Sequence, residues 1–378
     1  MHLTINRKEL LNALKVIKGS ACNVKLRPAH GCVHLDATRE RLMIEGARDS
    51  HGMSIALDPC EIEQHGKSAL KLKDALDILQ AMSDELVTLK SSQDKEIEFS
   101  QESFDFRHCA TVPPSEDVAS TLRLLAMSGE LIATIDASIL HKLISSTSHC
   151  IGRDDLRKNM MCLQLLFSNG AIEANATDGH RLAHYSIDVE HDITPGTELL
   201  LPRASALELA RVCKRASSCR LTISATHMSA QVDDTLIVIE LAQDKFFDIE
   251  FALKQISDCF TLPINTANLL SACALVTSGA LRRSKTHHVR LSASAGDVVT
   301  VHSSKEEEAA SRAVIPSSCA ERKISIRLNH HYLKQAIRAL KSEEIHMHLL
   351  DTLSPAFITP AEQPEGEDMR MIIMPMRM

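Results

Sequence analysis

The sequence predicts an α+β protein built from three tandem copies of one domain, each with two helices packed on antiparallel sheets. One observation is a spacing: helix-like segments begin at Asn6, Asp136 and Asn265, 130 and 129 residues apart in a chain of 378. The other is that alternating, strand-like stretches fill the intervals. A period this long indicates domain duplication, because solenoid repeats run about 20–50 residues. We therefore expect three domains at 1–129, 130–258 and 259–378, an α+β layout.

The first helix of each copy begins at an Asn or Asp, residue types that favour the N-cap position. Apolar residues follow at helical spacing, as in Leu10, Leu14 and Ile17. The second helix of each copy follows a short apolar lead-in, and these lead-ins are Leu72, Leu201 and Leu328. The helical segments are expected within 6–20, 71–83, 136–150, 202–216, 265–286 and 329–342.

Strands are expected where apolar and polar residues alternate, as in 41–45, 236–240 and 298–301. Asp178-Gly179 indicates a hairpin turn that exposes the two residues after it. Met374, Met376 and Met378 alternate along a terminal strand, and Pro375 should end its pairing because proline has no N–H donor.

Composition excludes several classes of protein. With no Trp, two Tyr and nine Phe, the chain lacks the exposed rings of a carbohydrate or base-stacking module. No apolar stretch reaches the roughly 18 residues of a membrane span, and residues 1–6 do not resemble an export signal. The 11 cysteines are scattered, with no pairing that suits zinc. We expect a cytoplasmic protein with reduced thiols, no metal and no cofactor.

Charge is unevenly distributed along the chain. The net charge of -7 alone argues against nucleic acid. The six helical segments, however, contain 17 Lys and Arg against 5 Asp and Glu, so the rest of the chain is strongly acidic. Helices that were merely solvated would mix the two signs. The bias predicts that the helices face one shared polyanion while the strands face outward.

Size then limits the assembly. A domain of 126 residues has a radius of gyration near 14 Å and a diameter of roughly 35 Å. Three such spheres in a ring leave a hole of only a few Å, whereas six leave roughly 30–35 Å. A ring around duplex DNA would therefore need two chains, each forming half of it.

Two short motifs identify a family. They are Ala-Thr-Asp-Gly-His-Arg-Leu-Ala at 176–183 and Met-Pro-Met-Arg-Met at 374–378. With them, the sequence resembles the β subunit of bacterial DNA polymerase III, the sliding clamp, over its whole length. The resemblance implies a homodimeric ring around double-stranded DNA, without sequence preference, that tethers polymerases and confers processivity. It implies no catalytic residue.

The resemblance also implies a cleft that binds short linear peptides of partner proteins. The expected partners are the DNA polymerase III catalytic subunit, the clamp loader, other polymerases and repair proteins. The matching cleft residues are Met160, Thr177, Gly179, His180, Arg181, Leu182, Phe247, Ala252, Leu353, Pro355, Ile372, Met374, Pro375, Met376 and Arg377. The expected DNA-facing residues are Arg153, Arg157, Lys158, Arg203, Arg211, Lys214, Arg215, Arg282, Arg283, Lys334 and Arg338.

The sequence departs from the family at one wall of this cleft. The family has Phe-Pro-Asp-Tyr where this chain has Phe-Phe-Asp-Ile at 246–249, so Phe247 and Ala252 replace residues that shape the pocket. The peptide preference is therefore open, and an accessory clamp is an alternative to the main replicative one. For the dimer contact, we expect the strand around 107–111 to pair with a region near Leu275 and Val276.

Two other functions, an enzyme and a sequence-specific DNA binder, fit the sequence less well. A hydrolase could use Asp178 and His180, but no nucleophile elbow accompanies them. The 66–68 Gly-Lys-Ser run lacks the first glycine of a phosphate loop, since position 61 is Glu. A sequence-specific DNA binder would bind linear DNA tightly, whereas a clamp should be retained on circular DNA only.

Overall fold

The computed structural model describes residues 1–21, 32–48, 50–91, 96–103, 110–111, 131–154, 156–253, 259–278, 288–294, 297–303, 311–317 and 323–376. The chain forms two compact units. The first unit comprises Met1–His141 and Ala204–Leu241, and the second comprises Lys142–Arg203 and Ala242–Met378. The middle repeat is thus divided between the two units. The expected repeat boundary at 129/130 lies outside the described residues, and the one at 258/259 lies where the described chain resumes.

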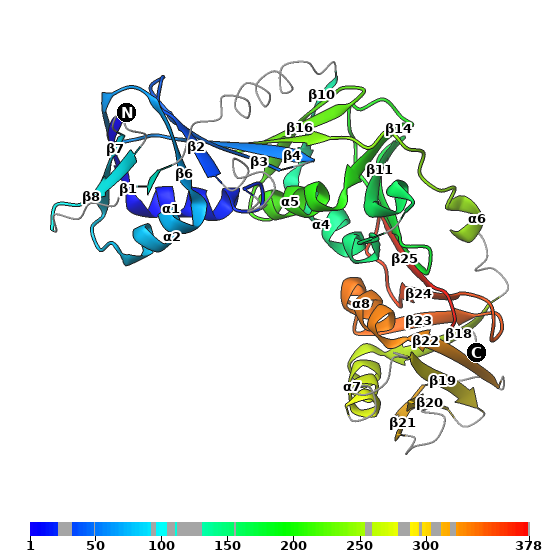
Figure 1. Cartoon of the computed structure of the whole chain (residues 1–378). Helices are drawn as coiled ribbons and strands as arrows, with labels where there is room; N and C mark the ends of the chain where they lie inside the picture. Colours follow the sequence, from blue (N-terminus) through cyan, green and yellow to red (C-terminus); the bar gives the residue numbers. More distant parts are fainter. Residues whose placement is uncertain are drawn as a thin grey trace. The chain divides into compact units, whose positions relative to one another are not determined.

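All six predicted helices are present (Figure 1). They are α1 (Arg7–Ile17), α2 (Leu72–Ala81), α4 (Ala137–Thr147), α5 (Arg203–Cys213), α7 (Thr266–Thr277) and α8 (His330–Leu340). The side chains of Asn6 and Asn265 accept backbone N–H groups at the starts of α1 and α7, as predicted, and Asn329 does the same at the start of α8. Asp136 likewise accepts from the backbone N–H of Ser138 at 2.7 Å. A further single-turn helix, α6 (Glu250–Leu253), was not predicted.

The first unit contains two antiparallel sheets. The smaller has the strand order β5 (Glu61–Gln64), β1 (His2–Asn6), β7 (Leu86–Ser91), β8 (Glu96–Ser100) and β9 (Ala110–Thr111). The larger has the order β10 (Leu131–Asp136), β15 (Ser218–Ile223), β16 (His227–Val232), β17 (Thr235–Glu240), β4 (His51–Leu57), β3 (Leu42–Arg48), β2 (Cys32–Asp36) and β6 (Lys67–Lys71).

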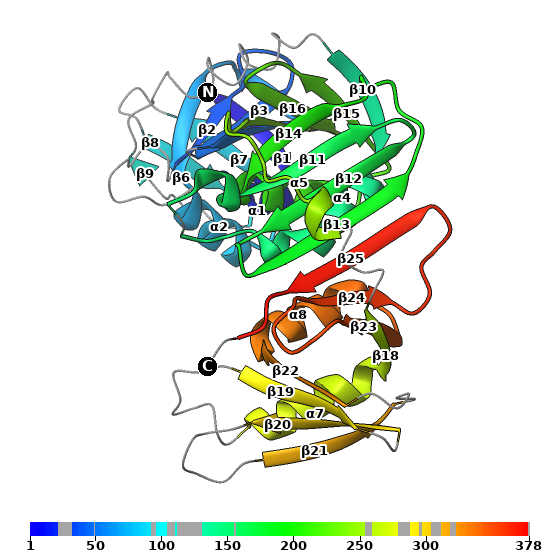
Figure 2. The ribbon, with the colours of Figure 1, turned by 90° about the vertical axis from the view of Figure 1, so that its right-hand side faces the viewer.

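The second unit follows the same plan (Figure 2). Its larger sheet has the order β14 (Thr197–Pro202), β11 (Cys162–Ser168), β12 (Ala171–Thr177), β13 (Arg181–Asp188), β25 (Glu367–Ile373), β24 (Ala356–Pro360), β23 (Glu344–Leu349) and β18 (Phe260–Asn265). Its smaller sheet has the order β21 (Ser311–Pro316), β20 (Val298–Ser303), β19 (His288–Ser294) and β22 (Ile324–Asn329).

Consecutive repeats are joined by strand pairing within each larger sheet. β4 of the first repeat pairs with β17 of the second, with Gly52 opposite Val238. β13 of the second repeat pairs with β25 of the third, with Leu182 opposite Ile372. Each larger sheet thus takes four strands from each of two repeats. Among the described residues, β5 and β9 are the outermost strands of one smaller sheet, and β21 and β22 are those of the other.

The helices cover the apolar cores because the apolar residues of each helix lie on one face. Leu10, Leu14 and Ile17 of α1 are buried, as are Leu333 and Ile337 of α8. Six of the eight described cysteines are also buried, and all eight are free thiols. In the part of the chain that the structure describes, no helix has the length and apolarity of a membrane span.

One sequence prediction about the third repeat is wrong. The last strand ends at Ile373, so the methionines do not alternate along it. Beyond it, the N–H of Met374 donates to the carbonyl of His180 and that of Met376 to the carbonyl of Arg327, while Pro375 between them has no N–H to donate. Leu275 and Val276, which mark the region expected at the dimer contact, lie in helix α7, and that contact stays a prediction. Residues 107–109, 377 and 378 lie outside the described residues.

Candidate functional site

The tight turn between β12 and β13 forms one wall of the site. The Oδ1 atom of Asp178 accepts the backbone N–H groups of His180 at 3.0 Å and Arg181 at 3.1 Å. The Thr177 hydroxyl donates to the carbonyl of Arg181 at 2.7 Å. Gly179 has φ of +83°, a left-handed conformation that favours glycine. The Asp-Gly turn predicted from the sequence is therefore present, but of the two residues expected to be exposed after it, only His180 is, because the Arg181 side chain is 10 % exposed.

Gly179 is also needed for close packing. A Cβ at this position would lie 3.2 Å from the Cε of Met160 and 3.3 Å from the Nη2 of Arg157. Met160 is buried, so the segment before β11 packs directly on the turn. A larger residue at position 179 would displace this wall.

An apolar pocket of about 250 Å³ opens beside the turn. Its floor crosses three neighbouring strands, with Leu182 on β13, Ile372 on β25 and Phe357 on β24 in one buried cluster. Ile249 and Ala252 of the segment around α6 pack against this cluster. The pocket is lined by Thr177, Gly179, Arg181, Leu182, Ala252, Pro355, Phe357, Ile372 and Met374.

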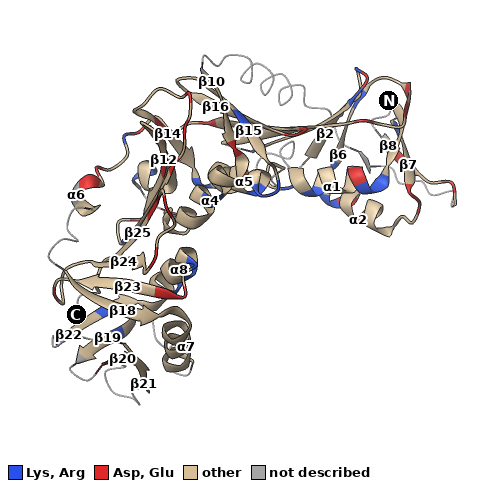
Figure 3. Ribbon diagram, turned by 180° about the vertical axis from the view of Figure 1, so that it is seen from behind, with Lys and Arg blue, Asp and Glu red and all other residues tan. Residues whose placement is uncertain are grey.

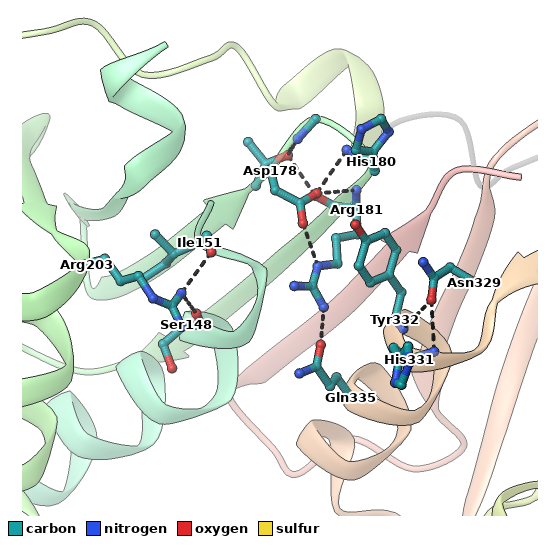
Figure 4. A network of polar contacts seen from close by, with 12 residues as sticks. Ser148, Ile151, Asp178, His180, Arg181, Arg203, Asn329, His331, Tyr332 and Gln335 are labelled. Atoms are coloured by element: carbon teal, nitrogen blue, oxygen red, sulfur yellow. Dashed lines mark hydrogen bonds and ion pairs between the residues drawn. The ribbon is translucent and has the colours of Figure 1, made fainter. Parts of the chain in front are cut away.

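Arg181 is held in place at the rim of this pocket (Figure 4). Its Nε donates to the Oδ2 of Asp178 at 2.9 Å, and its Nη1 donates to the side chain of Gln335 on α8. The guanidinium lies 4.2 Å from the ring centre of Tyr332, within the range of a cation–π contact. Burial raises the pKa of Tyr332. The sequence alone did not predict these two α8 residues as partners of the turn.

A second, polar pocket of about 480 Å³ adjoins the first, and Arg181 lines both. It is lined by Ile151, Gly152, Arg153, Asp154, Asp178, His180, Arg181, Tyr332 and Gln335. His180, expected in the cleft, therefore lines this polar side rather than the apolar pocket.

Apolar side chains remain exposed near the apolar pocket. Met374 is 43 % exposed and Leu353 is 69 % exposed. Asp351 fixes the loop that carries Leu353, because its Oδ1 accepts the backbone N–H groups of Leu353 at 2.7 Å and Ser354 at 2.6 Å. Pro375 and Met376 follow Met374 and are half-buried.

The two phenylalanines of the segment 246–249 lie in different surroundings. Phe246 is buried with Cys162 and Leu200, whereas Phe247 is half-buried beside it, with ring centres 5.9 Å apart. Phe247 does not line the apolar pocket. Sequence reasoning missed Phe357 and Ile249, although the apolar residues of 356–360, opposite the end of the last strand, were a usable signal for Phe357.

The predicted DNA-facing residues fall into three groups. Lys214, Arg215, Lys334 and Arg338 are exposed, as are Arg153, Arg157 and Lys158 in the loop before β11. Figure 3 shows Lys and Arg on α1, α5 and α8. Arg282 and Arg283 lie outside the described residues. Helix α7 itself contains no charged residue.

Two arginines in these helices have structural partners instead. Arg203 donates through Nη1 to the carbonyls of Ser148 at 3.2 Å and Ile151 at 2.8 Å (Figure 4). Arg211 forms an ion pair with Glu208 and donates to the carbonyl of Val16. Their charge is therefore less available to a ligand than sequence counting implied.

The arrangement offers binding surfaces rather than reaction chemistry. Both oxygens of Asp178 accept hydrogen bonds from the turn and from Arg181, which leaves this carboxylate committed to structure. Among the described residues, no group of His, Cys, Asp and Glu is placed to hold a metal ion.

Comparison with known proteins covers nearly the whole chain. Three family models match: the N-terminal domain of the DNA polymerase III beta subunit at residues 1–116, its central domain at 134–248 and its C-terminal domain at 260–377. The beta sliding clamps of Haemophilus influenzae and Escherichia coli are 25 % and 22 % identical, each over the full length of both chains.

Solved structures agree in fold. The DNA polymerase sliding clamp of Pseudomonas aeruginosa has a TM-score of 0.89 at 21 % identity, covering all of both chains. The DNA polymerase III beta subunit of Thermotoga maritima has a TM-score of 0.88 at 17 % identity, covering all of this chain and 99 % of the other.

Proposed function

We propose that this chain, which belongs to the DNA polymerase III beta subunit family and is a sliding clamp, holds its partner proteins by a short peptide seated in the apolar pocket beside Gly179. One observation carries the proposal. A buried apolar floor of Leu182, Phe357 and Ile372 lies beside an arginine whose position is fixed by Asp178, Gln335 and Tyr332.

The chemistry of this pocket suits a peptide anchor. Its volume of about 250 Å³ admits a large aliphatic or aromatic side chain, and its apolar floor gains free energy when that side chain displaces water. Arg181 provides a polar group at the rim. Exposed Met374 can adapt to different side chains because its thioether chain is unbranched and flexible.

The other junction between repeats explains why each chain would have one such cleft. By strand register, the positions of Leu182, Ile372 and Phe357 correspond to Gly52, Val238 and Ser229 at the β4–β17 junction. A glycine and a serine replace two of the three large floor residues there. The apolar floor therefore depends on residues of the second junction alone.

The strand scheme supports a homodimer. Each repeat has two runs of three consecutive antiparallel strands. In both larger sheets the last strand of the first run in one repeat pairs with the last strand of the second run in another, β4 with β17 and β13 with β25. In the same scheme β9, in the first repeat, and β21, in the third, are the corresponding strands that have no such neighbour among the described residues. We infer that β21 of one copy pairs with β9 of a second copy, twice, to close a ring of six domains with boundaries near 129/130 and 258/259.

The basic side chains of α1, α5 and α8 would then contact the phosphates of encircled duplex DNA, which requires no sequence recognition. The partners that the cleft would serve are the DNA polymerase III catalytic subunit, the clamp loader, other polymerases and repair proteins. The clamp family is a family of non-catalytic processivity factors, and nothing supports the hydrolase alternative.

Peptide titration of one variant tests the cleft. Met374→Glu places a charge at the apolar pocket, and we expect it to weaken a synthetic peptide from the clamp-binding segment of the catalytic subunit at least tenfold, because the charge must be desolvated. Calorimetry or fluorescence anisotropy measures this. Leu207→Glu, which alters a similarly exposed apolar residue on α5, is the matched control. Equal peptide affinity of Met374→Glu and wild type would refute the assignment of the cleft.

A further inference from the structure

A groove of about 620 Å³ lies on the larger sheet of the first unit, at the junction where β4 pairs with β17. The first repeat lines it with Met43, Ser54 and Ala56. The second repeat contributes Leu236. The cleft, by contrast, is built from residues of the second unit. Each junction between repeats therefore has a hollow, and the function proposed above uses only one of them.

The floor of the groove is largely apolar because alternate residues of neighbouring strands point the same way. Met43 of β3 lies opposite Ala56 of β4, and Leu236 of β17 lies opposite Ser54 of β4. Ser54 and Ala56 are two positions apart on one strand, so their side chains share a face of the sheet. Met43, Ala56 and Leu236 are half-buried. They leave apolar surface whose removal from water would favour binding of a ligand.

One polar group in this floor lacks a partner. Ser54 is 5 % exposed and lines the groove, and its hydroxyl forms no hydrogen bond with the described part of the chain. Buried hydroxyl groups are almost always hydrogen-bonded, because an unpartnered one destabilises the folded state. A ligand with a donor or acceptor at this point would satisfy the hydroxyl. Ser54 is therefore evidence for an occupant of the groove.

Arg41 fixes the rim of the groove across the junction. Its Nε donates to Asp58 at 2.5 Å, and its Nη2 donates to Asp234 of the second repeat at 3.0 Å. Its Nη1 is left without a partner among the described residues. Arg39 and Glu40 are exposed at the same rim and form no ion pair with the residues that the structure describes. Because both aspartates are already bonded to Arg41, the unused donors of the two arginines favour a carboxylate.

We propose that this groove is a second peptide site, which receives an extended segment of a partner protein with an apolar side chain next to an acidic one. The apolar side chain covers the floor, the peptide backbone bonds the Ser54 hydroxyl, and the carboxylate bonds Arg39 and the Nη1 of Arg41. Because the cleft belongs to the other unit, one chain would hold two partner segments at the same time.

The chemistry of the groove favours a peptide over DNA. A peptide combines an apolar side chain, a backbone polar group and a charge within a few ångströms, which matches the floor, the hydroxyl and the rim. Duplex DNA bound without sequence preference offers mainly phosphates, for which an apolar floor provides no partner. Glu40 and Asp234 at the rim would also repel phosphates.

Methyl NMR of the full-length chain, labelled at its methionine methyl groups, tests the site. Met43 lines the groove and Met374 lines the cleft, so one spectrum reports on both. The probe is the peptide acetyl-Glu-Leu-Glu-amide, with acetyl-Lys-Leu-Lys-amide and acetyl-Glu-Gly-Glu-amide as controls. We expect the probe to shift the Met43 signal, and each control peptide to bind about tenfold more weakly. The shift of Met43 should persist in Met374→Glu, whose cleft is blocked.

Substitutions separate the parts of the site. Ala56→Glu places a charge on the floor and should abolish the shift of Met43. Arg39→Glu should weaken the acidic peptide and strengthen the lysine peptide. Ser54→Ala should weaken the acidic peptide about threefold and yet raise the thermal midpoint of the free chain, because no hydrogen bond is lost with the hydroxyl. Ile132→Glu, at an exposed position of β10 in the same sheet, is the matched control.

The outcomes that overturn the proposal are distinct. If Met43 does not respond to the acidic peptide, or responds equally to the lysine peptide, the groove is not the site described. A response of Met374 alone would place the peptide in the cleft only. A lower thermal midpoint of Ser54→Ala would show that the hydroxyl has a structural partner. If the clamp-binding peptide of the catalytic subunit leaves Met374 unmoved, it is the proposed cleft that fails.

Discussion

Residues at corresponding positions of the two junctions between repeats differ in side-chain character. His51 is the first residue of β4 and lies opposite Ile239, while Arg181 is the first residue of β13 and lies opposite Ile373. Arg181 lines the edge of the apolar pocket. His51 is buried, with its Nδ1 3.3 Å from the Ser205 hydroxyl, and burial lowers its pKa to about 4.

The buried imidazole makes the stability of the first unit depend on pH. An unfolded His has a pKa near 6.5, so between about pH 6.5 and 4 the unfolded chain binds the proton that folded His51 excludes. The stability that this group contributes is present above pH 6.5 and is lost as the pH falls toward 4, on the order of 1–3 kcal/mol. Denaturant unfolding from pH 7.5 to 4.5 should show a shallower decline in His51→Gln than in wild type. An unchanged slope would contradict the assignment.

At the level of elements, the sequence predicts local structure well. Amphipathic spacing, with an Asn or Asp cap on the first helix of each copy, located the six helices, and Asp178-Gly179 located the turn, because these features depend on neighbouring residues. Strand alternation does not specify which strand is the neighbour, so the β4–β17 and β13–β25 pairings could not be predicted. The same limit hid Phe357, which reaches the cleft only through its pairing opposite Ile372.

Charges counted by segment describe the composition of the helices correctly. They do not show which of the basic side chains a ligand can reach. Arg7 donates to the carbonyls of Asp84 at 2.8 Å and Leu79 at 2.9 Å near the end of α2, much as Arg203 binds the turn after α4. Lys142 forms an ion pair with Glu367 at 2.5 Å. Tertiary contacts of this kind are not visible in a sequence. Exposed basic residues are concentrated on α1, α5 and α8 instead of on all six helices.

Helix α8 provides a direct test of the DNA-facing surface. Replacing Lys334 and Arg338 by Ala should weaken binding to a primed duplex and reduce the slope of log affinity against log salt by about 2, since each lost phosphate contact removes about 0.9. Fluorescence anisotropy between 50 and 200 mM salt measures both. Replacing Lys73 by Ala on α2, where Asp74 and Asp77 lie nearby in sequence, is the control. An unaltered salt slope in the α8 variant would show that this helix does not contact DNA.

At the scale of the whole molecule, the remaining question is how copies associate. Helix α7 packs on β21, an edge strand of its sheet, and both carry exposed apolar residues, Leu275 at 68 % and Val314 at 50 %. Two exposed apolar residues beside the free edge of a sheet are typical of an interface between subunits.

Sizing with light scattering tests this interface. The wild-type chain should have twice the mass of the 41.7 kDa monomer. Leu275→Asp should shift it to the monomer mass at micromolar concentration, because a charge would be buried against an apolar surface. Leu207→Asp should remain dimeric. A dimer that persists in Leu275→Asp would place the contact elsewhere.

The edge strands β9 and β21 are unlike surfaces, so each copy would offer one of each kind and bind head to tail. A substitution in one of these two surfaces therefore leaves the other surface intact. A copy altered only at Leu275, mixed with an unaltered one, would still share one intact seam with it. The product would be a dimer with one closed interface and one open interface. It would take up circular DNA without a clamp loader and would release that DNA equally easily.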